Sequence, residues 1–191
     1  HYSFVGLANY IKILREDATF WASLRVTLLY TVISVPAKLV AALFLAVLLS
    51  KKHSAIGIFR TAFYFPSILG SSVALAILWK YLFKSDGLVN MLLGFLSIKS
   101  VNWLGDPDIS LFTLMLLPLW QLGSPMVIFL AALKTVPSEL VEAAKIDGAG
   151  KIRSFFSITI PMITSVILFN LIMQTIEIIQ LFTPAFIITQ G

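Results

Sequence analysis

Residues 22–49 read ASLRVTLLYTVISVPAKLVAALFLAVLL, a run long and apolar enough to cross a lipid bilayer as one helix. A bilayer requires about 20 apolar residues in helical form, because backbone amides without hydrogen bonds are too costly in lipid. Pro36 lies near the middle of the run, where we expect a kink. The run predicts an integral membrane protein built from helices.

Further apolar runs follow at residues 58–83, 109–133 and 161–182. Four spans place both ends of the chain on one side of the membrane and the loop at residues 134–160 on the other. Lys and Arg are almost evenly divided between the two sides, so charge alone does not orient the protein. Residues 87–96 follow a turn signal and predict a short amphipathic helix at the interface.

The composition excludes several classes of protein. Of the 191 residues, 59% are hydrophobic and 12% charged, and the mean hydropathy is +0.95, whereas soluble domains average roughly 45–50% apolar and about 25% charged residues. The chain has no cysteine, and its two histidines, His1 and His53, lie far apart, so we expect no disulfide and no metal site. Basic residues lie between and beside the apolar runs and do not gather on one soluble face, which argues against nucleic-acid binding. The acidic residues are scattered, and we therefore expect no catalytic residues and no enzyme.

Polar residues inside the apolar runs lie at helical spacing. They are Thr27, Thr31, Ser34 and Lys38 in the first run, Gln121 and Ser124 in the third, and Asn170, Gln174 and Glu177 in the fourth. Hydrogen bonds between packed helices would explain the Ser and Thr residues. Charged groups at membrane depth are expensive, however, and typically face protein or water. Lys38 and Glu177 therefore favour a solvated translocation path lined by this set, with helix packing as the alternative.

The stretch EAAKIDGAGKIRSFF, residues 142–156, contains a Gly-Ala-Gly-Lys that is similar to part of a nucleotide-binding loop. A Walker A loop requires Gly, four residues, then Gly-Lys-Ser/Thr, entered from a strand. When Gly150 and Lys151 are aligned on that pattern, Lys145 stands at the first glycine and Ile152 at the hydroxyl position. No hydrophobic strand precedes the stretch. We therefore expect no nucleotide to bind here.

The same region predicts a helix–turn–helix on the membrane surface. Pro137 suits a first helical turn, and Glu139 and Glu142 lie near the positive end of the helix dipole. Gly148 is a typical helix stop, after which residues 151–159 can form a second short helix. The small residues between them would let a partner protein approach closely. An ordinary basic interfacial helix is the alternative.

Residues 142–161, EAAKIDGAGKIRSFFSITIP, resemble the EAA signature of bacterial ABC importer permeases: Glu-Ala-Ala, three residues, Gly, nine residues, then Ile-x-Leu-Pro. Every position is in register, and Ile160 replaces the usual Leu. Other stretches resemble the carbohydrate-uptake branch, the maltose-type permeases: FVGLANYIKIL, FRTAFYFPSILGSSVALAILWKYLF, VPSELVEAAKIDGA and the terminal TQG. The likeness covers essentially the whole chain.

The resemblance implies the all-α, type I ABC importer permease fold in a multi-pass protein of the bacterial cytoplasmic (inner) membrane. Residues 1–191 would form one permease domain with four of six core spans, the first and last being absent from this chain. Both ends would lie outside the cell, and the coupling loop at residues 134–160 would lie in the cytoplasm.

The resemblance also implies the membrane subunit of an ATP-driven importer, which moves a sugar or oligosaccharide by alternating access. The coupling loop would dock on a separate ATPase subunit, which binds ATP and Mg, through Glu139, Glu142, Ala143, Ala144, Asp147, Gly148 and Ala149. Further partners would be a second homologous permease, a periplasmic or lipid-anchored binding protein, and membrane lipid. Lys38, Lys80 and Lys84 would suit an acidic sugar. Glycerol phosphate as the solute, or an ion channel or proton-coupled transporter, are the alternatives.

Overall fold

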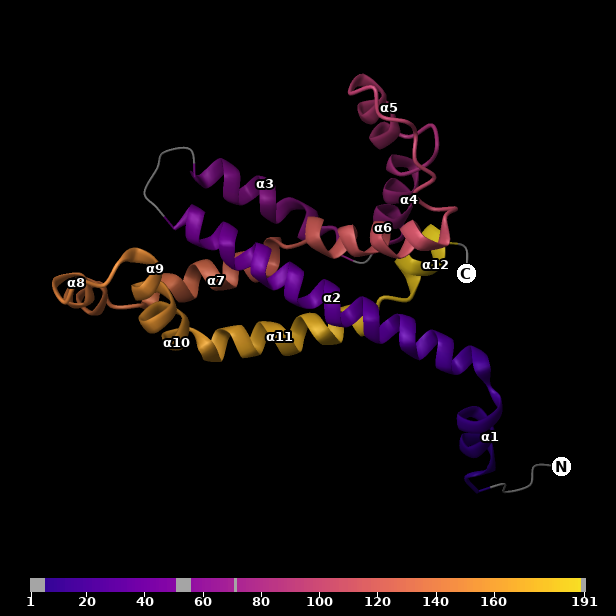
Figure 1. Cartoon of the computed structure of the whole chain (residues 1–191), viewed down its shortest axis with the longest axis horizontal. Coiled ribbons are helices and arrows are strands. Elements are labelled where there is room, and N and C mark those ends of the chain that lie inside the picture. The colour runs from indigo at the N-terminus through magenta and orange to yellow at the C-terminus, as the bar shows by residue number, and fades with distance from the viewer. Residues whose placement is uncertain (1–5, 51–55, 71, 190–191) are drawn as a thin grey trace.

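The computed structural model describes residues 6–50, 56–70 and 72–189, and every regular element in these ranges is helical (Figure 1). The elements are α1 (Ala8–Glu16), α2 (Ala18–Leu49), α3 (Ile56–Ile68), α4 (Val73–Leu82), α5 (Leu88–Phe95), α6 (Pro107–Trp120), α7 (Gly123–Thr135), α8 (Ser138–Ile146), α9 (Lys151–Ser154), the π-helix η1 (Phe155–Thr159), α10 (Ile160–Met162), α11 (Thr164–Ile179) and α12 (Thr183–Thr189). The predicted all-α class is confirmed.

Helix α2 is the one element in the described ranges that is long and apolar enough to cross a membrane unaided. Its first turn is capped by the Asp17 carboxylate, which accepts hydrogen bonds from the backbone amides of Thr19 and Phe20 at 2.9 and 3.0 Å. Side-chain caps of this kind satisfy amides that have no partner inside the helix. The helix runs through Pro36 without interruption.

The other candidate spans are helix pairs bent at a short break. Helices α3 and α4 meet at 108°, residues 109–120 of α6 meet α7 at 43°, and residues 151–162 meet α11 at 69°. Together with α2 these pairs give up to four candidate spans. The limits predicted for each span at residues 22–49, 58–83, 109–133 and 161–182 stay predictions, because the structure contains no lipid.

Glycine and proline account for the first two breaks, and a proline precedes the third, which lies at Ile163. Gly70 has a φ of +56°, which ends α3 because few other residues adopt that conformation at low cost. Pro125 has no amide hydrogen, so the carbonyl of Gln121 loses its helical donor between α6 and α7. Pro161 removes the donor for the Ser157 carbonyl in the same way, and the chain there forms the π-helical turn η1.

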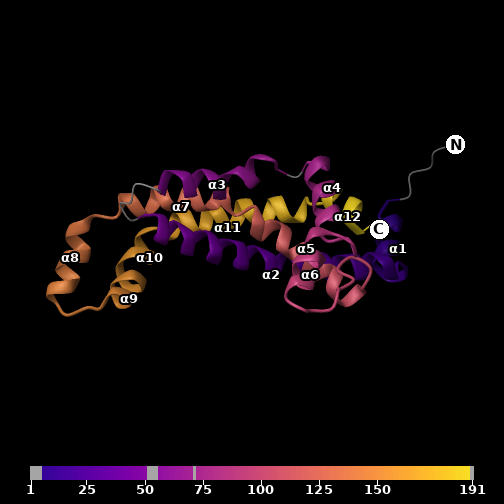
Figure 2. The ribbon, with the colours of Figure 1, turned by 90° about the horizontal axis from the view of Figure 1, so that it is seen from above.

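Helix α2 packs against α6, α7 and α11, as can be followed in Figures 1 and 2. Its close contacts use small residues, since Ala42 and Ala46 are fully buried. Helix α3 crosses α7 at Gly123, where an added Cβ would lie 2.4 Å from the Phe63 carbonyl oxygen. Helix α12 packs against α4. Small residues thus set how closely the bent spans approach each other.

Aromatic side chains from two other helices bind the backbone of α6. The Tyr30 hydroxyl donates to the Leu114 carbonyl, and Trp79 Nε1 donates to the Thr113 carbonyl, each at 3.2 Å. The Leu114 carbonyl needs such a donor, because the residue four positions later is Pro118. Helices α2 and α4 therefore supply hydrogen bonds to α6 next to the carbonyl that Pro118 leaves without its helical donor.

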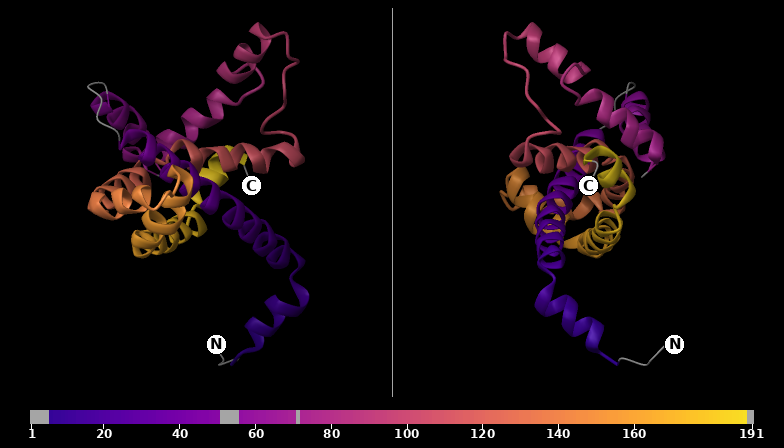
Figure 3. Two further views of the ribbon diagram at one scale, coloured as in Figure 1. Left: turned by 60° about the vertical axis from the view of Figure 1, so that its left-hand side comes forward. Right: turned by 90° about the vertical axis from the view of Figure 1, so that its right-hand side faces the viewer.

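Helix α5 stands away from the bundle at the end of α4 (Figure 3). Its buried Asn90 connects α5 to the segments on either side of it. The Asn90 side-chain amide donates to the Ser85 and Val101 carbonyls, and Oδ1 accepts from the backbone amide of Val101 and from Trp103 Nε1, at 2.9–3.1 Å. The predicted helix at residues 87–96 is confirmed. Its place at the membrane interface stays a prediction, supported by the exposed apolar side chains of Phe95 and Leu96.

Candidate functional site

The elbow, which we define as α8, the turn at residues 147–150 and α9, projects beyond one end of the bundle (Figures 1 and 2). Helix α8 ends in a Schellman turn, in which the Ala149 amide donates to the Ala144 carbonyl at 2.8 Å and the Gly148 amide donates to the Lys145 carbonyl at 3.0 Å. This turn places Gly148 at a φ of +80°, so a glycine is required there. The predicted helix–turn–helix is confirmed, with α8 beginning at Ser138, one residue after Pro137.

The seven predicted docking residues are all presented by the elbow. Those exposed are Glu139, Glu142, Ala143, Asp147 and Gly148, and those half-buried are Ala144 and Ala149. Helix α8 has no buried residue, and its main contacts within the described ranges are with α9 and η1. A helix that buries so little against its own chain leaves its faces free for another protein.

The second site is the polar seam, which we define as Ser34 and Lys38 of α2 with Asn170, Gln174 and Glu177 of α11. These helices pack side by side, and Lys38 Nζ lies 3.5 Å from Glu177 Oε2. The Lys38 side chain is 3% exposed, whereas the Glu177 side chain is 42% exposed. The ion pair thus has one end inside the bundle and the other at its surface, which explains how a lysine is tolerated at this depth.

Polar atoms of the seam lack partners within the described part of the chain. Ser34 Oγ, Asn170 Oδ1 and Gln174 Oε1 are buried, and no described group donates to them. Buried polar atoms are normally hydrogen-bonded, so an unpaired set marks a place for water, a ligand or a partner protein. The Asn170 amide, in contrast, is satisfied by the Val166 carbonyl at 3.0 Å.

The remaining path candidates lie elsewhere. Thr27 lines a separate cavity of about 120 Å³ beside Tyr30, and the Thr31 hydroxyl donates back to the Thr27 carbonyl at 2.7 Å. Gln121 is buried and donates to the Gly70 carbonyl at 2.7 Å, joining the break in α3–α4 to the break in α6–α7. Ser124 is exposed. Whether these four residues line a path stays a prediction.

Two residues with a structural role went unnoticed in the sequence. Tyr30 supplies the donor that Pro118 removes from α6, and Arg60 Nη2 donates to the Leu49 carbonyl at 2.8 Å, closing the last turn of α2. The prolines mark which carbonyls need a donor, but the sequence does not tell which side chain provides it. Neither residue belongs to the seam or to the elbow.

Residues 19–191 match the family model described as "Binding-protein-dependent transport system inner membrane component". The chain is 47% identical over 188 residues to Probable ABC transporter permease protein YesP of Bacillus subtilis, an alignment covering 98% of this chain and 61% of that protein. It is 33% identical over 190 residues to Trehalose/maltose transport system permease protein MalF of Thermococcus litoralis, covering 98% and 64%. The chain thus spans less than two thirds of either relative.

The fold is similar to that of a chain in the crystal structure of a bacterial ABC transporter involved in the import of the acidic polysaccharide alginate. The TM-score is 0.78 at 22% identity, and the match covers 90% of this chain and 60% of that one. The predicted architecture is confirmed by this likeness, which at such identity concerns the fold alone.

Proposed function

Because the chain belongs to the family of inner-membrane components of binding-protein-dependent transport systems, we propose that it forms half of the translocation path of an ATP-driven sugar importer. Family membership confirms that it is a non-catalytic component of the inner membrane, as predicted. Its relatives carry additional chain, so the activity of the whole transporter, its solute and its partners are proposals here.

The elbow is the observation that carries the proposal. It sits at one end of the bundle, buries little, and presents the carboxylates of Glu139 and Glu142 to solvent. An ion channel or proton-coupled transporter has no need of such a projection. We assign the elbow as the contact for a separate ATPase subunit, which binds ATP and Mg and whose closure swings the spans between inward-facing and outward-facing states.

The polar seam supports the path. Its unpaired oxygens on Ser34, Asn170 and Gln174 are hydrogen-bond acceptors, and the hydroxyl groups of a sugar are donors that suit them. A second homologous permease would provide the other wall, and a periplasmic or lipid-anchored binding protein would deliver the solute. The seam lies between α2 and α11, so a change in the packing of these two helices would open or close it.

Contacts of the lysines favour a neutral sugar over an acidic one. Lys38 is paired with Glu177, and Lys84 with Asp86, where the nitrogen–oxygen distance is 3.2 Å. The hydrogen bond from Lys84 holds the pKa of the exposed Asp86 carboxyl below its ordinary value, which favours the charged carboxylate that faces the lysine. Two of the three lysines predicted to suit an acidic sugar, Lys38 and Lys84, thus already face a carboxylate of their own chain.

Charge reversal in the elbow tests the coupling. In the full transporter reconstituted in vesicles, Glu142→Lys should lower solute uptake more than about tenfold and weaken co-purification of the ATPase subunit, because a carboxylate–cation contact becomes a repulsion. Glu16→Lys, on exposed α1 at the other end of the chain, is the matched control and should leave both unchanged. Wild-type uptake in Glu142→Lys would reject the docking role.

The solute class is tested through the cognate binding protein. Calorimetric titration with neutral oligosaccharides and with uronate oligosaccharides of equal length should show binding of the neutral series. Preference for the uronates would instead support an acidic sugar. If neither series binds, the solute is not a carbohydrate of these classes, and the proposed role of the elbow is unaffected.

A further inference from the structure

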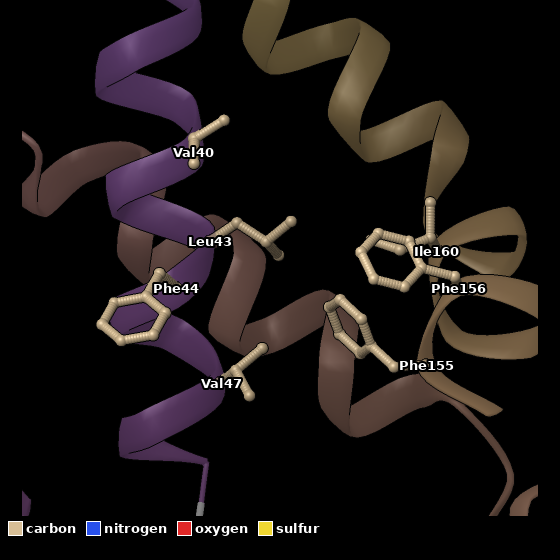
Figure 4. Close-up of a pocket in the computed structure, with 7 residues that line it drawn as sticks. All are labelled: Val40, Leu43, Phe44, Val47, Phe155, Phe156 and Ile160. Atoms are coloured by element: carbon tan, nitrogen blue, oxygen red, sulfur yellow. The ribbon is translucent and has the colours of Figure 1, made fainter. Parts of the chain in front are cut away.

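An apolar groove runs between the last turns of α2 and the π-helix η1. We define the lipid groove by its lining residues, Val40, Leu43, Phe44, Val47, Phe155, Phe156 and Ile160, which enclose about 410 Å³ (Figure 4). Leu43 and Val47 point from α2 toward the two phenylalanine rings. Those rings lie 5.3 Å apart, edge to face. The volume is within the range of ligand pockets, about 300–1,000 Å³.

The groove lies beside the elbow and is lined by residues of two candidate membrane spans. Phe44 and Phe156 are 61% and 64% exposed in this chain, and such apolar surface has no place in water. A lipid chain gains little from an apolar wall alone, because its surroundings in the bilayer are equally apolar. Any preference among lipids must therefore come from groups that meet the lipid headgroup.

Two exposed cations lie one helical turn from the phenylalanines. Lys151 precedes Phe155 by four positions and Arg153 precedes Phe156 by three, and residues at these spacings share a helix face. Residues 151–162 contain no acidic side chain. Positions 151 and 153 are two apart, so the two cations flank the face of the phenylalanines on opposite sides, in the helical turn between the groove and the rest of the elbow. A headgroup would lie between them when acyl chains occupy the apolar part of the groove.

We propose that the lipid groove, with Lys151 and Arg153 at its mouth, binds an anionic phospholipid. The two cations contact the phosphate and the acyl chains pack on Phe155 and Phe156. Basic pockets between membrane helices on the cytoplasmic side bind anionic headgroups by this chemistry. Assignment to the inner leaflet rests on the proposed cytoplasmic position of the elbow, whereas the groove and its cations do not depend on the transported solute.

The test uses photo-crosslinking in the full transporter, with all its subunits, in phosphatidylcholine nanodiscs. One sample contains a trace of phosphatidylglycerol with a diazirine on its acyl chain, and the matched sample contains phosphatidylcholine with the same diazirine. Labelled peptides are mapped by mass spectrometry. We expect phosphatidylglycerol to label residues 40–47 or 155–160 more strongly than phosphatidylcholine does. Each cation at the mouth should raise this ratio about five-fold, so the two together should raise it roughly 25-fold.

Variants separate the headgroup from the groove. Lys151→Gln with Arg153→Gln should bring the two probes to equal labelling, whereas the control pair Lys12→Gln with Arg15→Gln, on exposed α1, should keep the preference. Leu43→Trp should fill the groove and lower labelling by both probes.

Two results would overturn the proposal. Absence of labelling in both segments would mean that protein covers the groove, either further spans of this chain or the second permease. Equal labelling of the unmodified transporter by the two probes would mean that the cations do not select the lipid. Glu142 lies on α8, whereas the two cations lie on α9 of the same elbow. Neither labelling result bears on uptake by Glu142→Lys, so the lipid site and the role of Glu142 in docking are tested separately.

Discussion

The elbow and the polar seam owe their structures to different kinds of contact, local in the elbow and long-range in the seam. In the elbow, local sequence determines the conformation: the Schellman turn at Gly148 forms from hydrogen bonds within seven residues, 143–149, and the side chains remain exposed. In the seam, residues 139 positions apart, Lys38 and Glu177, meet only because α2 and α11 pack together. Local structure shapes the surface offered to a partner, and long-range packing shapes the polar interior.

The comparison predicts different responses to substitution. Changes in the bundle should alter the stability of the permease, because its residues are held by neighbours on several helices. Changes in the elbow should leave the bundle intact and alter only what it contacts. The expected loss of stability decreases from Gly123→Val, through Glu177→Leu, to Gly148→Val.

Gly123→Val should have the largest effect. An added Cβ would lie 2.4 Å from the Phe63 carbonyl oxygen and 2.6 Å from the Tyr64 Cα, and backbone atoms cannot move away cheaply. Overpacking of this kind destabilises by about 1–3 kcal/mol or more, so thermal melting in detergent should show little folded permease. Gly94→Val in α5, where nothing lies within 4 Å, is the control. Equal melting of the two variants would contradict the close crossing of α3 and α7.

Glu177→Leu should have an intermediate effect, because it leaves the Lys38 ammonium buried without a partner. Breaking a fully buried pair costs about 3–5 kcal/mol. Here we expect about 2 kcal/mol, since the carboxylate is partly exposed and screened. Lys38→Met combined with Glu177→Leu should recover most of the loss in a melting experiment while uptake stays impaired. A double variant no more stable than the single one would show that the pair is not coupled.

Gly148→Val should have the smallest effect on stability and a large one on transport. A β-branched residue at a φ of +80° costs about 1–2 kcal/mol, confined to the elbow, so the bundle should melt almost as before. ATP hydrolysis and solute uptake should become uncoupled in reconstituted vesicles. Gly150→Ala is the control, because Gly150 has an ordinary φ of −67°. Coupled transport in Gly148→Val would mean that the shape of the elbow is not needed.

The sequence was sufficient where structure depends on neighbouring residues. Gly148 marked the end of α8, residues 87–96 marked α5, and the polar spacing marked the faces of α2 and α11. It was insufficient where helices meet. The apolar run at residues 58–83 gives no measure of the 108° bend, and Pro36, which suggested a kink, lies in an uninterrupted helix. Pro36 in α2 and Pro125 between α6 and α7 each remove a helical donor, and only the second lies at a break, so the surrounding packing decides whether the helix breaks.

The polar stripes illustrate the same limit. Their spacing put Lys38 and Glu177 on helix faces, but periodicity cannot tell which helices are neighbours, so the ion pair was not foreseen. The spacing also could not distinguish Ser34, whose hydroxyl has no partner among the described residues, from Thr31, whose hydroxyl donates to a carbonyl of its own helix. Separating these residues requires knowing the rotamer of each side chain and which groups surround it.

The hydrogen bond from Gln121 to the Gly70 carbonyl connects the break between α6 and α7 to the break between α3 and α4. Straightening α3 against α4, or α6 against α7, would stretch this 2.7 Å contact unless both corners moved in concert. Movement at one corner should therefore favour movement at the other, by about 0.5–1.5 kcal/mol if this hydrogen bond is kept.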